Sequence, residues 1–161
     1  MLRVYCPLYV FSWLLYLIVQ AYNIFMLRIY CDGACSGNPG PGAWAYIAFD
    51  GNLIVASANG AFSETTNNRM ELLSAINAAF AFDNCTIIVD SKYVKDGITD
   101  WIKKWRMNGW KSSTGAVKNI DLWQKLDHIT SLKNICWEWE KGHNNSTHDL
   151  VDELARGSVL R

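Results

Sequence analysis

The fold of this chain is decided by a run of strands that opens with Arg-Ile-Tyr-Cys-Asp-Gly-Ala at residues 28–34. Alternating and β-branched residues predict two further strands, at residues 43–49 and 53–59. Glycine and proline residues at 37–42 separate the first two strands, and Asp-Gly-Asn at 50–52 separates the second from the third. Because Asp-Gly is a strong signal for a β-hairpin, we expect these three strands to pair antiparallel.

The rest of the chain alternates between helical and strand patterns. Apolar residues recur at helical spacing from a Thr-Thr-Asn cap at residues 65–67 to about residue 82, and a continuous apolar run at 86–89 predicts a buried strand. The prediction is completed by a strand at 135–140 and by helices at 92–98, 100–107, 117–128 and 148–157. Because helical crossovers make the last two strands parallel, the sequence predicts an α/β fold. Its five-stranded mixed sheet has three antiparallel strands, then two parallel ones, and is flanked by helices.

The composition places the chain among compact globular proteins. Of its 161 residues, 50% are hydrophobic and 19% charged, which fits one domain with a sizeable core and excludes a disordered chain. The 15 basic and 15 acidic side chains cancel, so a polyanionic partner needs a local basic patch. The five cysteines are scattered without a C-x-x-C pair, which indicates neither a disulfide framework nor a zinc site. A reducing compartment, and hence the cytoplasm, is the expected location.

Residues 1–25 form a hydrophobic extension in front of the domain, which we expect over residues 26–161. Residues 4–25 carry no charge and are long enough to span a bilayer. Three interpretations stay open: a membrane anchor, a signal peptide cleaved near Val19-Gln20-Ala21, and a segment upstream of the true start codon. We favour the third, because translation from Met26 would begin directly before the first strand. Membrane attachment is expected only if residues 4–25 are retained.

Three acidic residues stand where purely structural roles would not place them. Asp32 interrupts an apolar strand, Glu71 lies beside the apolar stripe of a helix, and Asp90 ends a buried strand. Each of them, taken singly, is typical of a capping or helix-dipole residue. The three elements can however converge at one edge of the sheet, where carboxylates repel one another unless cations hold them. Asp152, in the last predicted helix, supplies a fourth carboxylate.

A cluster of carboxylates predicts a particular metal and a particular chemistry. Oxygen ligands suit Mg²⁺, with Mn²⁺ as an alternative. Two such ions about 4 Å apart serve phosphodiester hydrolysis, in which one activates water and the other stabilises the leaving oxygen. The sequence therefore predicts a site for two Mg²⁺ ions.

These carboxylates lie in motifs that closely resemble those of the type I ribonuclease H family, enzymes that cut the RNA strand of an RNA–DNA hybrid. The resemblance covers about residues 26–157, and the matching motifs include residues 30–42, 65–72, 89–94, 137–143 and 152–156, in family order. It implies the ribonuclease H-like fold, endonuclease cleavage that is independent of sequence, and products with 5′-phosphate and 3′-hydroxyl ends. It also implies a set of catalytic residues: the metal-binding carboxylates Asp32, Glu71, Asp90 and Asp152, and the mobile loop histidine His143, which assists proton handling or product release.

The loop that precedes Asp152 departs from the bacterial pattern of this family. It is one residue shorter, and it carries His148 at the position where bacterial members usually have an asparagine. The sequence leaves the role of His148 open.

A basic segment over residues 92–118 predicts the surface that holds the nucleic acid. Its seven lysine and arginine residues outnumber two aspartates, and tryptophans are interleaved with them. The segment resembles the basic protrusion of bacterial and eukaryotic family members, which grips the DNA strand. A monomer that needs no obligatory protein partner is therefore expected. The residues of this segment that we expect to contact the hybrid are Lys92, Trp101, Lys103, Lys104, Trp105, Trp110, Lys111 and Lys118.

The resemblance implies further contacts with the hybrid outside this segment. Thr66, together with Asn119 near the end of the segment, is implied to form a pocket for a DNA phosphate. The residues implied to lie near 2′-hydroxyl groups and bases are Cys35, Asn38, Asn67 and Asn68. Polar contacts to the 2′-hydroxyl group let a protein distinguish RNA from DNA without reading the sequence.

Two other classes of function stay open beside a ribonuclease H. One is a module that binds hybrids without cutting them, or a membrane-tethered accessory protein; the other is a nuclease of the same fold that cuts DNA. The presence of all four carboxylates argues against the first class, because a binding protein has no use for a repelling acidic cluster. A panel of substrates distinguishes the nucleases.

Overall fold

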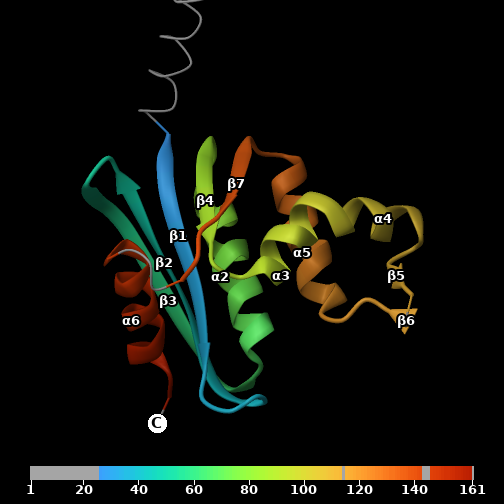
Figure 1. Ribbon diagram of the computed structural model, residues 1–161, viewed down its shortest axis with the longest axis horizontal. Coiled ribbons are helices and arrows are strands. Elements are labelled where there is room, and N and C mark those ends of the chain that lie inside the picture. The colour runs from blue at the N-terminus through green and yellow to red at the C-terminus, as the bar shows by residue number, and fades with distance from the viewer. Residues whose placement is uncertain (1–25, 114, 143–145, 161) are drawn as a thin grey trace, which may run out of the picture.

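The computed structural model describes residues 26–113, 115–142 and 146–160, so the hydrophobic extension at 1–25 lies outside the described residues. Five strands form one sheet in the order β3-β2-β1-β4-β7 (Figure 1). Their bounds are Leu27–Cys35 for β1, Gly40–Asp50 for β2, Leu53–Thr65 for β3, Cys85–Val89 for β4 and Ile135–Trp139 for β7. Over the described part of the chain, no helix has the length and apolar character needed to cross a membrane.

The directions of the strands confirm the predicted mixed sheet. β2 pairs antiparallel with both β1 and β3, while β4 pairs parallel with both β1 and β7. The parallel pairs are joined by helical crossovers, as the alternation of patterns along the sequence predicts. β1 therefore lies at the centre of the sheet, where its residues are covered on both faces.

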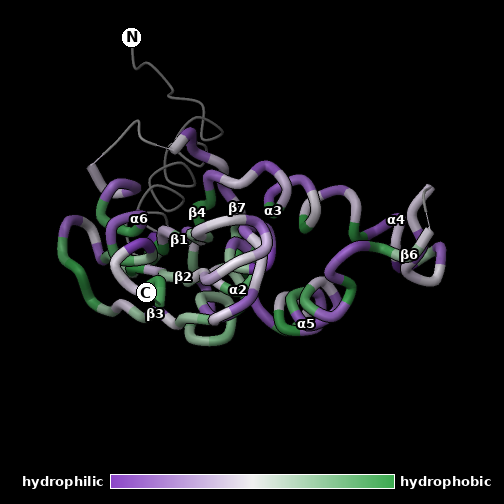
Figure 2. Tube along the Cα trace, turned by 90° about the horizontal axis from the view of Figure 1, so that it is seen from below, coloured by the Kyte–Doolittle hydropathy of each residue, from purple (hydrophilic) through white to green (hydrophobic). Residues whose placement is uncertain are grey.

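Helices cover both faces of the sheet, and the alternation along β1 decides which side chain meets which helix. Ile29 and Cys31 are buried in the larger core cluster, with α2 (Asn67–Ala81) and α5 (Ile120–Ser131). Tyr30 points to the opposite face and is buried with residues of α6 (Ser146–Ser158). Figures 1 and 2 show α2 and α6 on opposite sides of the sheet. The central strand thus holds both helical layers in place.

A protrusion extends from one end of this body, built by the residues between β4 and α5. It contains α3 (Lys92–Asp96), a π-helical turn η1 (Gly97–Trp101), α4 (Ile102–Met107) and the short strands β5 (Lys111–Ser112) and β6 (Gly115–Ala116). In both views the part from α4 to β6 lies away from the sheet (Figures 1 and 2). The predicted basic segment therefore forms this protrusion, and its apolar residues Val94, Ile98 and Ile102 belong to the main core.

Several predicted boundaries differ from the structure, and each difference has a local cause. β3 runs to Thr65 rather than ending at Asn59, since β2 reaches back to Gly40 and offers it a partner. Gly60, which reads as a strand end in the sequence, is required inside β3: a Cβ there would lie 2.7 Å from the Trp44 indole nitrogen. α5 begins at residue 120 rather than 117, because Asn119 adopts a left-handed conformation with φ 57°.

The remaining differences concern short segments. The predicted helices at 92–98 and 100–107 are continuous through the π-helical turn. The β5–β6 hairpin was not predicted, because two-residue strands leave no periodic pattern. The last helix begins two residues earlier than predicted, at Ser146.

Gly33 is expected to be intolerant of even one methyl group. A Cβ at this position would lie 2.4 Å from the backbone nitrogen of Glu71 and 2.5 Å from the carbonyl carbon of Met70. Because both atoms belong to the backbone of α2, the helix would have to move away from β1. We expect Gly33→Ala to lower the free energy of unfolding by about 2–3 kcal/mol. Denaturant unfolding measures it, with Gly157→Ala as a control, because a Cβ on Gly157 meets no atom within 4 Å and this glycine has no left-handed backbone. A Gly33→Ala variant as stable as the wild type would contradict this packing.

Candidate active site

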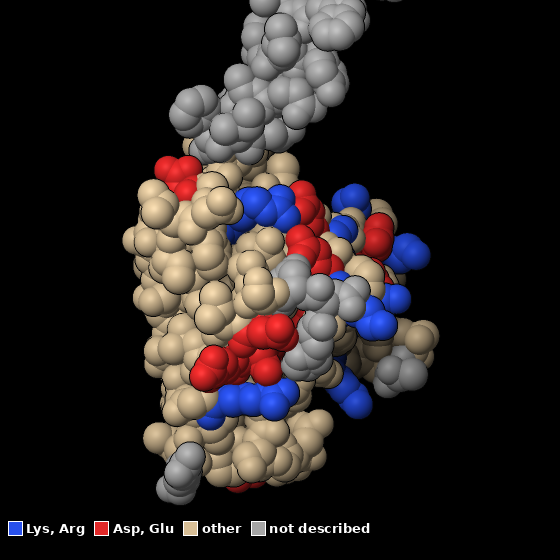
Figure 3. All heavy atoms as spheres, turned by 60° about the vertical axis from the view of Figure 1, so that its left-hand side comes forward, with Lys and Arg blue, Asp and Glu red and all other residues tan. Residues whose placement is uncertain are grey.

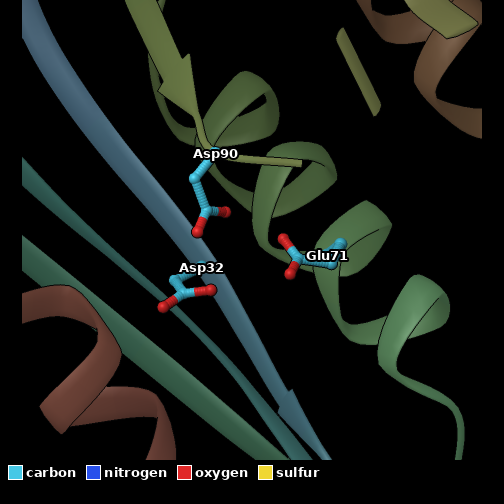
Figure 4. A group of neighbouring side chains, drawn as sticks. All are labelled: Asp32, Glu71 and Asp90. Carbon is cyan, nitrogen blue, oxygen red and sulfur yellow. The ribbon is translucent and has the colours of Figure 1, made fainter. Parts of the chain in front are cut away.

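Three carboxylates converge at the sheet edge where β4 ends (Figure 4). Asp32 lies on β1, Glu71 on α2 and Asp90 directly after β4. One oxygen atom of each lies within 4.8 Å of the others. Asp32 and Glu71 are buried, and Asp90 is half-buried. The convergence predicted from the sequence is therefore present.

The pairing of the strands explains why these carboxylates meet. Cys31 of β1 pairs with Val89 of β4 in the parallel ladder, so Asp32 and Asp90 are the next residues of two adjacent strands. Glu71 reaches them from the first turns of α2, because Gly33 lets that helix lie against β1. The parallel pairing of β1 with β4 and one glycine contact thus place three acidic groups from distant parts of the sequence side by side.

Asp152 of α6 joins the same pocket from the other face of the sheet. All four carboxylates line a pocket of about 200 Å³. Asp152 is not part of the tight group of three, and its Oδ1 accepts a hydrogen bond of 2.7 Å from Nε of Arg156, one turn later in α6. The fourth predicted carboxylate therefore lines the pocket, but it is paired with the guanidinium group of Arg156.

The electrostatics of the pocket favour protonated carboxyl groups when no metal ion is bound. Burial, with the charges of Asp90 and Asp152, raises the pKa of Asp32 to about 7. A hydrogen bond of 2.7 Å from the backbone N–H of Gly33 to Oδ1 of Asp32 acts in the opposite direction, because it stabilises the ionised form. Burial and the neighbouring carboxylates also raise the pKa of Glu71. Acidic groups packed this closely ionise together only if positive charge enters the pocket.

The donor set fits a divalent cation. Oε1 of Glu71 accepts a hydrogen bond of 3.4 Å from the side chain of Asn67, while its buried Oε2 has no hydrogen-bond partner among the described residues. A buried carboxylate oxygen without a partner is costly unless an ion uses it. Carboxylate oxygens without nitrogen or sulfur ligands suit Mg²⁺ or Mn²⁺. Asp32, Glu71 and Asp90 would hold such an ion.

Two histidines of interest follow β7 in the sequence, and the structure describes one of them. His143 lies outside the described residues, whereas the preceding Gly142 lines the pocket, and a Cβ on it would meet Oδ2 of Asp90 at 2.5 Å. His148, whose role the sequence leaves open, lies inside α6 and is 2% exposed. It lines the carboxylate pocket and packs edge-on against Tyr30, with ring centroids 5.1 Å apart. It is therefore part of the floor of the site.

Four residues predicted to lie near the RNA strand occupy the turn after β1 and the start of α2. Asn38 in the turn is exposed, and its Oδ1 accepts a hydrogen bond of 3.3 Å from the backbone N–H of Asn67. Cys35 donates from Sγ to the carbonyl groups of Gly40 and Thr65. Asn68 is exposed on the first turn of α2. These side chains border the carboxylate pocket through Asn67, which touches Glu71.

Thr66 and Asn119, predicted to form one phosphate pocket, lie on either side of Arg69. Thr66 is the N-cap of α2, and its carbonyl accepts from the backbone N–H of Arg69. The guanidinium group of Arg69 donates to Oδ1 of Asn119 at 3.4 Å and to both carboxylate oxygens of Asp121, at 3.0 and 2.7 Å. Sequence reasoning missed Arg69, although it is the only basic residue of the 65–72 motif.

The tryptophans of the protrusion that we predicted to contact the hybrid pack against other aromatic side chains of the protein. Trp101, Trp105 and Trp110 are half-buried and follow one another with ring centroids 5.8 and 6.4 Å apart. Trp105 also meets the fully buried Trp123 of α5 at 5.3 Å. This chain of rings anchors the protrusion to the core, and contact of its exposed edges with substrate stays a prediction. The lysines expected there are exposed: Lys92, Lys103, Lys104, Lys111 and Lys118.

A second missed residue is Trp139, at the end of β7. Its indole Nε1 donates a hydrogen bond of 2.8 Å to the backbone carbonyl of Asp90. The ammonium group of Lys92 lies 4.9 Å from the centre of its ring, within the range of a cation–π interaction. Trp139 therefore holds the backbone that carries Asp90 and positions a lysine predicted to bind substrate. The alternation of tryptophan and glutamate at residues 137–140 was its signal in the sequence.

Known proteins are similar to this chain over most of its length. The family model described as RNase H matches residues 26–159. The chain is 52% identical over 142 residues to the ribonuclease H of Jannaschia sp. (strain CCS1), which covers 83% of this chain and 90% of that protein. It is 49% identical over 140 residues to the ribonuclease H of Anaplasma marginale (strain St. Maries), and this match covers 84% of this chain and 91% of that protein.

Solved structures give the same result at the level of the fold. LC9-RNase H1, described as a type 1 RNase H with the type 2 active-site motif, superposes with a TM-score of 0.73. It is 30% identical, and the match covers 83% of this chain and 72% of that one. LC11-RNase H1, solved in complex with an RNA/DNA hybrid, is 19% identical and has a TM-score of 0.64, with 83% and 96% covered.

Proposed function

Because the chain belongs to the RNase H family, we propose that it is an endonuclease that hydrolyses the RNA strand of RNA–DNA hybrids with two divalent metal ions, independently of sequence. The products would carry 5′-phosphate and 3′-hydroxyl ends. The observation that carries this proposal is the convergence of Asp32, Glu71 and Asp90, with oxygen atoms within 4.8 Å of one another. Mg²⁺ is the proposed cofactor, because all the ligands are oxygen atoms.

The residues around the carboxylates hold them in fixed directions. The N–H of Gly33 orients Asp32, the amide of Asn67 orients Glu71, and the indole of Trp139 fixes the backbone at Asp90. Divalent ions bound there would lower the pKa of a bound water molecule, which activates it for attack, and would supply positive charge at the scissile phosphate. The carboxylates contribute positioning and charge balance, so the ions meet a site that needs little rearrangement.

The substrate would be held on both sides of this pocket. We propose that Cys35, Asn38, Asn67 and Asn68 lie along the RNA strand, and that Thr66 and Asn119 hold a DNA phosphate beside Arg69. The exposed lysines of the protrusion would neutralise further phosphates of the DNA strand. A chain that carries its own basic protrusion should bind the hybrid as a monomer without a partner protein.

The proposed function is tested by cleavage of labelled nucleic acids. The full chain and a chain that starts at Met26 are incubated with an RNA–DNA hybrid, duplex DNA, duplex RNA and single strands, with Mg²⁺ or with EDTA. We expect both chains to cut only the RNA strand of the hybrid, at many positions and only with Mg²⁺. Binding of the hybrid without cleavage would point to a module without catalysis, and cleavage of DNA to another nuclease of this fold.

The lysines of the protrusion give a separate prediction about affinity. Lys103, Lys104 and Lys111 are exposed, and none of them forms an ion pair with another described residue. Replacing all three with Gln should raise the KM for the hybrid and leave kcat within a factor of about two, because the carboxylate site is untouched. The slope of log affinity against log salt should flatten by about 1 for each lysine that contacts a phosphate. An unchanged slope would show that the protrusion does not contact the substrate.

A further inference from the structure

Arg156 lies on the boundary between the carboxylate pocket and a larger groove. It lines the pocket of about 200 Å³ with the four carboxylates, and it also lines an adjacent groove of about 520 Å³. The groove runs from the end of β1, at Cys35, past Asn67 to the C-terminal turns of α6. Arg156 is the only lysine or arginine among the described residues that line either space.

The ion pair between Arg156 and Asp152 uses one nitrogen atom of the guanidinium group and one oxygen atom of the carboxylate. Nε of Arg156 lies 2.7 Å from Oδ1 of Asp152. The two terminal guanidinium nitrogen atoms form no hydrogen bond to any other described residue, and the arginine side chain is 65% exposed. Figure 3 shows the acidic surface of this face bordered by basic side-chain atoms. The arginine therefore keeps donors that point into solvent at the edge of the groove.

This position creates competition for Asp152. A carboxylate that is neutralised by a guanidinium group is a weaker ligand for a divalent ion, and ions in the pocket repel the guanidinium group. The Arg156 side chain is 65% exposed, so water screens its ion pair with Asp152 and the arginine can exchange its partner at little cost. Guanidinium groups bind phosphate oxygen atoms well, and the groove leads along residues already proposed to follow the substrate.

We propose that Arg156 exchanges partners during the reaction: it holds Asp152 in the enzyme free of metal and substrate, and it binds a backbone phosphate of the hybrid in the adjacent groove once metal ions occupy the pocket. The phosphate half of this inference rests on the proposed function. The competition with metal ions concerns the enzyme alone. Arg156 thus links release of the fourth carboxylate to capture of the substrate.

The variants Arg156→Gln and Arg156→Lys of the full chain separate these two roles. Mn²⁺ binding to the substrate-free protein is measured by titration calorimetry, and KM and kcat for the hybrid are measured at saturating Mg²⁺. We expect Arg156→Gln to bind Mn²⁺ about 3-fold more tightly. It should raise the KM for the hybrid about 5-fold and leave kcat within 2-fold of the wild type. The slope of log affinity for the hybrid against log salt should flatten by about 1. Arg156→Lys keeps the charge without the Nε contact, so Mn²⁺ affinity should rise partway while KM stays near that of the wild type.

A matched control removes one positive charge elsewhere. Lys125 is exposed on α5, and Lys125→Gln should change neither the affinity for Mn²⁺ nor the KM for the hybrid. Unchanged Mn²⁺ affinity in Arg156→Gln would overturn the exchange, and a rise without any change in KM would overturn the phosphate contact. If Arg156→Lys binds Mn²⁺ as the wild type does, the pair with Asp152 is not what competes, and the proposal fails. A wild-type chain that cuts no hybrid would refute the proposed function, while the Mn²⁺ titration would still decide the competition at Asp152.

Discussion

Replacing Asp32 with Asn is expected to reduce hybrid cleavage at saturating Mg²⁺ by about 1,000-fold or more, which corresponds to about 4 kcal/mol of lost transition-state stabilisation. Asp32 lies on the central strand of the sheet, and the charges of both Asp90 and Asp152 act on it. An amide keeps the shape of the side chain but supplies neither the negative charge nor the second strong oxygen ligand. Single-turnover cleavage of a labelled hybrid measures the loss.

The fold should survive this substitution, which makes the result specific. The hydrogen bond from the N–H of Gly33 to Oδ1 can be kept by the amide oxygen of Asn. Asp50→Asn serves as the matched control, because Asp50 is exposed at the end of β2 and lies outside the carboxylate pocket. Its activity should equal that of the wild type. If Asp32→Asn kept substantial Mg²⁺-dependent cleavage, Asp32 could not be a metal ligand and the proposed mechanism would be wrong.

The stability of the metal-free protein should fall as the pH rises from about 4 to about 7. In the unfolded chain, the carboxyl group of Asp32 loses its proton near its ordinary pKa, about 3.9. In the folded protein, burial and the neighbouring carboxylates raise that pKa to about 7. Between these two pH values the folded state binds more protons than the unfolded state, so stability decreases as the pH rises. For Asp32 alone the full loss, reached above pH 7, is about 4 kcal/mol.

Thermal unfolding in EDTA across this pH range, for the wild type and Asp32→Asn, isolates the contribution of Asp32. We expect the two proteins to be equally stable near pH 4 and the variant to be more stable at pH 8, because an amide does not ionise. Mg²⁺ at pH 8 should raise the melting temperature of the wild type much more than that of the variant. Parallel pH profiles for the two proteins would show that the cluster does not strain the folded state. The acidic cluster thus lowers the stability of the metal-free protein, and the same charges favour the binding of Mg²⁺.

The chemistry of the site could be read from local features of the sequence. Asp32 interrupts an apolar strand, Asp90 ends one, and Glu71 follows a helix cap, so each is identifiable from its immediate neighbours. The order of strands and helices then predicts that they meet, because adjacent parallel strands end at the same edge of a sheet. The family-model match over residues 26–159 confirms the resemblance stated from these motifs.

Residues that act through partners distant in the sequence could not be found in this way. Arg69 matters through Asn119 and Asp121, which lie 50 and 52 positions away, and Trp139 matters through Asp90, 49 positions away. His148 is the first residue of the last helix predicted from the sequence, but nothing in its own segment shows that its side chain is buried against Tyr30 of β1. Periodicity and capping signals report only on a residue's own segment.

The sequence by itself determined the order of the main helices and strands and the mixed sheet, because hydrophobic periodicity and local turn chemistry are properties of short segments. It also pointed to the four carboxylates, through their unusual positions and through the family motifs that contain them. Only the tertiary structure decided which charges share one pocket, that Asp152 is paired with Arg156, and that Trp105 of the protrusion packs on Trp123. Burial and pairwise electrostatics depend on distances between segments, and these distances exist only once the sheet has brought the segments together.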